Sequence, residues 1–213
     1  MSGAVDELPP ARRLTRRGLA TRDRIVSAAA TLMHTRGVNA TTLDDVRVAS
    51  GTSKSQLYRH FPDKESLVQA VISRQAEGVL ERHRQRLERL NSIRGLELWR
   101  DGVVQRNALR NGAYGCELGS LASELADQDE AARLTLNEHF HTWQGLLTSG
   151  LARMVEAGAL RPDADPDALA TGLMAALQGG YLLAQTARDV GPMQIALDMA
   201  VAHVKSFATT PEA

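Results

Sequence analysis

The sequence from residue 41 to residue 67 reads TTLDDVRVASGTSKSQLYRHFPDKESL. Its first part predicts a short helix, because Thr41 or Thr42 can cap the start and two aspartates follow near the positive end of the helix. Leu43, Val46 and Ala49 are spaced to form one buried stripe on this helix. The Ser-Gly-Thr triplet that follows breaks the pattern and predicts a turn.

A second short helix is predicted directly after that turn. Ser53 and Gln56 form the S-x-x-Q pattern of a capping box, and Leu57 points inward before Phe61-Pro62 ends the helix. Two short helices joined by a tight turn match the helix-turn-helix motif, whose second helix lies in the major groove of DNA. A helical hairpin with a polar surface fits the pattern alone equally well.

Longer helices are predicted on both sides of this pair. The earlier one spans residues 21–36 and ends at Gly37, a residue type suited to helix C-termini. The later one follows the Asp63 cap, and its charged second half, residues 81–89, is expected to face solvent. Apolar residues at helical spacing support both helices: Ile25, Ala28, Ala29 and Leu32 in the first, and Val68, Val71, Ile72 and Val79 in the second.

The remainder of the chain predicts further helices and no alternating β pattern, so we expect an all-α fold. These helices are expected at about residues 95–110, 117–127, 129–157, 166–188 and 192–208. We divide the chain into a disordered basic arm over residues 1–18, a three-helix helix-turn-helix domain over 19–65, and a helical C-terminal ligand-binding and dimerisation domain over 66–213.

Charge is distributed unevenly along a chain whose formal net charge is zero. Residues 11–64 hold 11 Lys or Arg against four Asp, a net charge of +7, whereas residues 65–213 carry a net charge of −5. A basic end on a neutral chain is typical of a nucleic-acid-binding module attached to a domain with another role. The single cysteine allows no intrachain disulfide, and no apolar run approaches the roughly 20 residues that span a bilayer. We therefore expect a cytoplasmic protein without a membrane partner.

Double-stranded DNA is the expected partner of the second short helix. Its outward N-terminal half consists of Ser53, Lys54, Ser55 and Gln56. Lys54 and Gln56 are the candidates for base contacts, because lysine can donate to guanine and glutamine can pair in two ways with adenine. The candidates for phosphate contacts, which fix the position on the duplex, are Thr41, Thr42, Arg47, Tyr58, Arg59, His60 and Lys64. In the arm, the residues suited to the DNA backbone or the minor groove are Arg12, Arg13, Arg16 and Arg17.

The same stretch resembles the DNA-binding domain of the TetR family of transcriptional regulators. The residues that meet the family's pattern are Thr42, Asp45, Val46, Ser50, Gly51, Thr52, Ser53, Lys54, Leu57, Tyr58, His60, Phe61, Lys64 and Leu67. The similarity covers roughly residues 20–70 without a gap, and Val48 stands where a small residue is common. The resemblance implies an all-α fold, a C-terminal dimer, and usually a repressor that a small-molecule ligand releases from a palindromic operator.

The C-terminal part resembles a TetR subgroup in residues 115–125, GCELGSLASEL, and residues 177–180, LQGG. Glu117 departs from the proline expected there, so its helix could start differently. A small-molecule pocket needs apolar walls with a few polar groups, and several aromatic and polar residues of the body fit that need. The candidate ligand-binding residues are Trp99, His139, Phe140, Trp143, Met174, Gln178 and Tyr181. Ordinary core packing is the alternative role for each of them.

The last two predicted helices are the candidates for a homodimer interface. They are rich in Ala, Gly, Leu and Met, and glycines such as Gly172 and Gly179 let a partner helix approach closely. A dimer presents two recognition helices, which read two half-sites when they lie about 34–36 Å apart or a multiple of that distance. A ligand that altered this spacing would weaken DNA binding.

An enzyme is the main competing class, and the sequence offers little for it. His139 and His141 lie two residues apart, which on a helix separates them by about 200°, so they cannot hold one metal ion. The patterns of zinc peptidases, phosphate loops, dinucleotide folds and serine hydrolases are absent, and Cys116 has no histidine near it in sequence. We expect no catalytic residue, metal or cofactor. A DNA-binding dimer with a solid body and no ligand is the second alternative.

Overall fold

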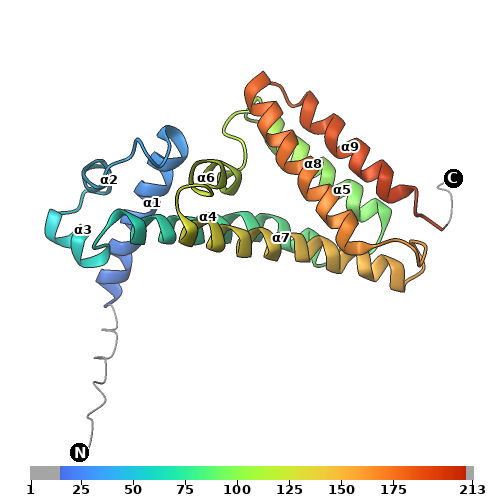
Figure 1. Ribbon diagram of the computed structural model, residues 1–213, viewed down its shortest axis with the longest axis horizontal. Helices are drawn as coiled ribbons and strands as arrows, with labels where there is room; N and C mark the ends of the chain where they lie inside the picture. The colour runs from blue at the N-terminus through green and yellow to red at the C-terminus, as the bar shows by residue number, and fades with distance from the viewer. Residues whose placement is uncertain (1–14, 210–213) are drawn as a thin grey trace, which may run out of the picture.

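The computed structural model describes residues 15–209, which form nine α-helices and one isolated β-bridge between Leu160 and Ala208. The helices are α1 (Arg16–Arg36), α2 (Leu43–Ser50), α3 (Lys54–His60), α4 (Lys64–Leu87), α5 (Ile93–Ala108), α6 (Glu117–Leu125), α7 (Glu130–Glu156), α8 (Pro166–Ala187) and α9 (Gly191–Lys205). Figure 1 shows a head made of α1, α2, α3 and the start of α4, and a larger body made of the other helices. The prediction of an all-α fold is confirmed.

The first helix begins earlier than the sequence analysis predicted. Thr15 caps α1 by accepting a hydrogen bond from the Gly18 N–H at 3.2 Å, and the helix starts at Arg16. Arg16 and Arg17 therefore lie in a helix, and their placement in a disordered arm was wrong. The other two arginines of the predicted arm, at positions 12 and 13, lie outside the described residues.

Side-chain caps fix both short helices of the head. Thr42 and Asp45 form a capping box at the start of α2, and Ser53 and Gln56 form the predicted one at the start of α3. Gly51, between the two helices, has a φ of 63°, a left-handed conformation that glycine adopts without steric cost. These local interactions set the angle at which α3 leaves α2.

The core of the head is formed by apolar residues from all four of its helices. Ile25, Val46, Leu57 and Leu67 are at most 1% exposed. The predicted third member of the α2 stripe, Ala49, is exposed instead, so that part of the prediction was wrong. A spacing of three residues falls short of the 3.6-residue turn, and two such steps carry a side chain about 120° away from the start of the stripe.

The helix α4 runs without interruption from the head into the body (Figure 1). The expected domain boundary after residue 65 falls in its first turn. Leu67 and Val71 are buried near its head end, and Leu80 and Leu87 are buried farther along. Most of residues 81–89 are exposed as predicted, but His83 and Leu87 turn inward.

In the body, α7 lies along α4, and α8 packs between α7 and α9 (Figure 1). Two ion pairs tie α5 to α9: Lys205 to Glu97 and Arg100 to Asp198, each at 2.5 Å. The hydrogen bond from Lys205 is the main reason that the pKa of Glu97 lies below its ordinary value. These contacts fix α9, the last helix of the body, against α5.

One side chain of the body holds the turn between α1 and α2. The carboxylate of Glu124, on α6, accepts hydrogen bonds from the backbone N–H groups of Val38 at 2.7 Å and Asn39 at 3.4 Å. Gly37 has a φ of 90°, and a Cβ at that position would lie 3.1 Å from both carboxylate oxygens. The glycine therefore lets Glu124 approach closely, and α6 is connected directly to the head.

Candidate functional site

The surface of the head carries an exposed polar face on α3. Ser53, Lys54 and Ser55 are exposed, whereas Leu57 is 1% exposed and anchors the helix in the head core. Tyr58, which is 45% exposed, and Arg59 extend the same surface. These hydroxyl, ammonium, phenol and guanidinium groups can donate hydrogen bonds to phosphates and base edges.

Gln56 has a second role that limits how it can meet a base. Its Oε1 accepts the backbone N–H of Ser53 at 2.9 Å, while Ser53 Oγ accepts the N–H of Gln56 at 3.2 Å. A two-point contact with adenine uses both the oxygen and the nitrogen of the amide. In this conformation the nitrogen is free, whereas the oxygen already accepts one hydrogen bond within the cap, so a two-point contact would have to share that oxygen with Ser53.

The residues flanking α3 divide into contact candidates and structural residues. Thr42 is exposed, whereas Thr41 is fully buried and its hydroxyl donates to the Gly37 carbonyl at 2.8 Å. Thr41 therefore holds a turn, and its prediction as a phosphate contact was wrong. Arg47 is half-buried and forms an ion pair with Asp44 at 2.7 Å, which offsets part of its charge.

The end of α3 and the start of α4 add two further predicted residues. Lys64, in the first turn of α4, is partly exposed. Burial, and then the charges of Arg22 and Arg59, lower the pKa of His60 below its ordinary value.

Arg22 is a cation of this face that sequence reasoning missed. Its guanidinium lies 5.1 Å from the centre of the Phe61 ring, in the range of a cation–π contact. The residue is exposed on α1, and only the general basic character of the N-terminal end signalled it.

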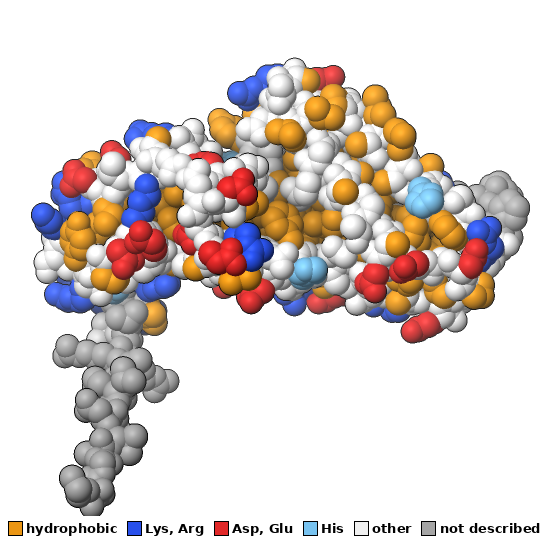
Figure 2. Space-filling model, in the orientation of Figure 1, with side chains coloured by type: hydrophobic (Ala, Val, Ile, Leu, Met, Phe, Trp, Pro, Cys, Tyr) orange, Lys and Arg blue, Asp and Glu red, His pale blue; other side chains and the backbone are white. Residues whose placement is uncertain are grey.

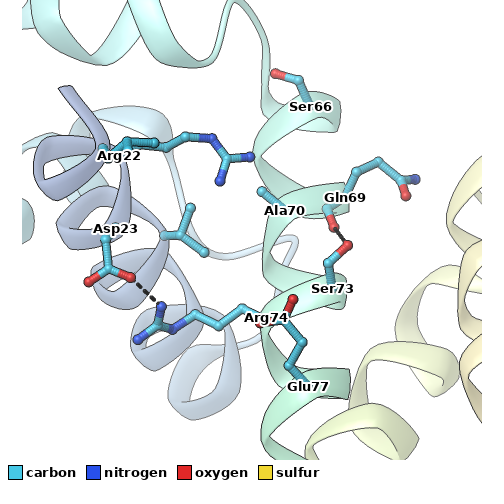
Figure 3. A pocket seen from close by; sticks show the side chains of 10 residues that line it. Arg22, Asp23, Ser66, Gln69, Ala70, Ser73, Arg74 and Glu77 are labelled. Carbon is cyan, nitrogen blue, oxygen red and sulfur yellow. Dashed lines mark hydrogen bonds and ion pairs between the residues drawn. The ribbon is translucent and has the colours of Figure 1, made fainter. Parts of the chain in front are cut away.

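A hollow of about 480 Å³ lies on the surface of the head between α1 and α4. Figure 3 shows Arg22 and Asp23 on one wall and Gln69 and Arg74 on the other. The two walls are joined by an ion pair from Arg74 Nη1 to Asp23 Oδ1 at 2.5 Å. None of the predicted ligand-binding residues lines this hollow.

A different cleft, of about 370 Å³, lies between α6, α7 and α8, and we call it the α6–α8 cleft. Its lining residues are Cys116, Gly119, Ser120, Ala122, Ser123, Phe140, Gln178, Gly179, Tyr181, Leu182 and Gln185. Three predicted ligand-binding residues, Phe140, Gln178 and Tyr181, are thus brought together. The lining residues on α6 belong to the stretch 115–125 that carried the subgroup resemblance.

The polar groups of the α6–α8 cleft are uncharged. The Nε2 of Gln178 is buried and has no hydrogen-bond partner among residues 15–209, so it is a free donor beside the cleft. Burial raises the pKa of the Cys116 thiol, which keeps it protonated and unreactive at neutral pH.

The other predicted ligand-binding residues lie elsewhere. Trp99 and Trp143 are each 1% exposed and pack around His83, which accepts the Trp99 indole N–H at 3.0 Å and lies 4.6 Å from the Trp143 ring. Met174 is 7% exposed in the core, and His139 is a partly exposed residue of α7. None of these four lines the α6–α8 cleft, so core packing, the alternative role, applies to the two tryptophans and Met174.

An apolar face covers the outer side of α8 and α9. Leu182, Leu183, Ile195 and Met199 are between 55% and 70% exposed, and Figure 2 shows hydrophobic side chains gathered over these two helices. At Gly172 and Gly179 an added Cβ would meet no atom within 4 Å. The single chain therefore leaves this face open.

Within residues 15–209, no three His, Cys, Asp or Glu side chains are grouped so that they could hold a metal ion. No helix in that part of the chain is long and apolar enough to cross a membrane.

Two family models match the chain. The model described as "Tetracyclin repressor-like, C-terminal domain" matches residues 86–200, and the one described as "Bacterial regulatory proteins, tetR family" matches residues 25–71. The first match alone covers more than half of the 213 residues, and the second includes the whole helix-turn-helix.

Curated relatives and solved structures agree with these matches. The HTH-type transcriptional repressor KstR2 of Rhodococcus jostii is 29% identical over 155 residues, covering 68% of this chain and 70% of the relative. The HTH-type transcriptional regulator LmrA of Bacillus subtilis is 25% identical over 175 residues, covering 81% of this chain and 90% of the relative. A TetR transcriptional regulator from Chloroflexus aurantiacus is 25% identical and superposes with a TM-score of 0.80, covering 91% of this chain and 98% of that chain.

The order of the helices, the exposed helix-turn-helix and the two family matches lead to one conclusion. The chain belongs to the TetR family of transcriptional regulators.

Proposed function

We propose that the protein is a repressor that binds a palindromic operator as a homodimer and leaves it when a small molecule occupies the α6–α8 cleft. The observation that carries this proposal is the double role of α6. Ser120 and Ser123 of this helix line the cleft, and Glu124 of the same helix holds the turn between α1 and α2. A ligand in the cleft therefore meets the helix that contacts the head.

DNA binding is supported by the exposed face of α3. Lys54 and Ser55 are free to contact base edges, and Gln56 can donate from its amide nitrogen. Thr42, Arg47, Tyr58, Arg59, His60 and Lys64 surround them as candidates for phosphate contacts.

Dimer formation is supported by the open apolar face of α8 and α9. Four large apolar side chains more than half exposed on two adjacent helices are typical of an interaction surface. A second copy of the chain is the natural occupant, because a two-fold pair of heads matches the symmetry of a palindromic operator.

Release follows if the ligand favours a position of α6 that differs from the DNA-bound one. The shift in DNA affinity can then be no larger than the difference in ligand affinity between the two states. The hydrogen bonds from Val38 and Asn39 to Glu124 carry the change in α6 to the head.

The experiment that tests DNA binding begins with selection of bound fragments from a random duplex pool. Fluorescence anisotropy then measures the affinity of the selected duplex for wild type, Lys54→Ala and the control Arg133→Gln, whose exposed ion pair with Glu130 lies on α7. Loss of a base contact is expected to weaken Lys54→Ala by about 5- to 150-fold, from roughly 1–3 kcal/mol. Equal affinity of Lys54→Ala and wild type would refute the role of α3.

Release is tested with the same duplex and a library of small molecules. A molecule that lowers the anisotropy of the wild-type complex should lose its effect on Phe140→Ala, because Phe140 lines the α6–α8 cleft. If Phe140→Ala responds as wild type does, the cleft is not the effector site.

A further inference from the structure

Next to the α6–α8 cleft lies a smaller hollow of about 140 Å³ to which three arginines contribute, and we call it the arginine hollow. Arg82 comes from α4, Arg106 from α5, and Arg110 from the turn after α5. Glu117, at the start of α6, is the acidic residue among the lining residues. Tyr181 lines both the hollow and the cleft, so the two spaces adjoin across one side chain.

The positive charge of this hollow is not balanced within the described part of the chain. Arg82 pairs with Glu117 at 2.8 Å, but Arg106 and Arg110 form no ion pair with any of residues 15–209. Gathering like charges is unfavourable unless an anion offsets them. The arginines also act on buried neighbours: burial, and then Arg82, Arg106 and Arg86, lower the pKa of His83 to about 3.

Two further features show that the surroundings accommodate this cluster. Arg86 lies against α5 at Gly102, where an added Cβ would collide with its guanidinium, so the glycine makes room for another cation beside Arg106. Asn107 is only 5% exposed, lines the hollow, and its Oδ1 has no hydrogen-bond partner among the described residues. A buried amide of this kind is stabilised when a ligand supplies the missing partner.

The two adjoining spaces complement one molecule with two ends. The α6–α8 cleft offers the ring of Phe140, the thiol of Cys116 and uncharged amides, but no charged side chain. The arginine hollow offers guanidinium groups, which bind carboxylate and phosphate oxygens with charge-assisted hydrogen bonds.

We propose that the arginine hollow binds the carboxylate or phosphate of an effector whose uncharged, largely apolar body lies in the α6–α8 cleft. This inference rests on the proposed function, because it takes that cleft as the effector site. It adds the chemical class: the effector is an amphipathic organic anion. Arg106 and Arg110 bind its charged group, and Asn107 accepts a hydrogen bond from a hydroxyl or N–H of the same molecule.

The test uses two fluorescent probes that share one aromatic body. 8-Anilinonaphthalene-1-sulfonate carries an anionic group, and N-phenyl-1-naphthylamine lacks it. Binding of each is titrated to the full chain as wild type, as Arg106→Gln/Arg110→Gln, and as a control, Arg94→Gln/Arg133→Gln. The control removes the same charge from exposed residues that pair with Glu97 and Glu130, away from the hollow. Circular dichroism checks that each variant retains its helix content.

We call Arg106→Gln/Arg110→Gln the hollow variant. The sulfonate probe should bind it at least about tenfold more weakly than it binds wild type, because each hydrogen bond to a charged group contributes more than a factor of ten in affinity. The uncharged probe should bind all three proteins alike, and the control should bind both probes as wild type does. If the hollow variant binds the sulfonate probe with an affinity within twofold of wild type, the arginine hollow is not an anion site.

The same titrations separate this inference from the proposed function. Phe140→Ala should weaken both probes, because it removes part of the shared apolar wall. If neither probe binds wild type, or if Phe140→Ala changes neither affinity, the cleft itself fails as a ligand site and the inference fails with it. If Phe140→Ala weakens both probes while the hollow variant matches wild type, only the anion site is refuted.

Discussion

Replacing Glu124 by alanine should loosen the turn between α1 and α2. The carboxylate accepts the Val38 N–H at 2.7 Å, and Val38 is only 2% exposed, so water cannot readily replace the lost acceptor. A hydrogen bond to a charged group contributes roughly 1.5–3 kcal/mol. Glu124→Ala should therefore lower the melting temperature by about 3–12 °C in a chain of this size.

Amide hydrogen exchange measures the effect at the turn itself. If the same free energy is lost from local opening, the segment 37–40 should exchange about 10- to 150-fold faster in Glu124→Ala than in wild type. Glu124→Gln keeps a neutral acceptor, so its exchange should lie between those two rates. Glu138→Ala, an exposed glutamate of α7, is the matched control and should exchange as wild type does. Unchanged protection of segment 37–40 in Glu124→Ala would refute the idea that α6 holds the head.

Further predictions concern base reading, assembly and pH. Gln56→Ala should relax the base preference at one position of the selected duplex by roughly 1 kcal/mol, and it also removes the half of the α3 capping box in which Gln56 accepts the Ser53 N–H. An unchanged preference in repeated selection would leave Gln56 a structural residue. Met199→Glu should turn the dimer into a monomer in sedimentation experiments, because it places a charge in the apolar face of α8 and α9. Leu109→Glu, at an exposed site outside these helices, should stay dimeric. A dimeric Met199→Glu would exclude this face as the dimer interface. His83 has a folded-state pKa of about 3, below the unfolded value, so the unfolded chain gains a proton first as the pH falls. Stability should therefore drop by up to about 1.4 kcal/mol per pH unit between pH 6.5 and 3, and His83→Gln should show a shallower decline in urea unfolding; equal slopes would contradict this.

The helix caps and the turn of the head could be predicted from the sequence. The Ser53–Gln56 box, the Asp63 cap and the inward Leu57 depend on residues three or four positions apart, and the structure has all of them. Gly51 ends α2 where the Ser-Gly-Thr triplet indicated a turn. Such signals are complete within one turn of helix, which is why these helix ends could be identified from the sequence, although the Thr15 cap of α1 was missed.

Contacts between distant segments could not be read in this way. Glu124 and Val38 lie 86 positions apart, and no local pattern announces their hydrogen bond. The same applies to His83, which looked like part of a solvated face because charged residues surround it in sequence. Trp99 and Trp143 were expected at a pocket, but they bury their rings against His83. An aromatic residue on an amphipathic helix has the same pattern whether it lines a cavity or fills a core.

Because α4 runs without interruption from the body to the head, a small movement of its body end becomes a larger movement of the head. Its 24 residues, at 1.5 Å per residue, make a rod of about 36 Å whose far end supports the head. A tilt of only about 5° at the body end displaces the other end by about 3 Å, close to the roughly 3.4 Å rise of one base-pair step. An arm of this length thus converts a small change of angle at the body into a displacement of the head that is comparable with one base-pair step.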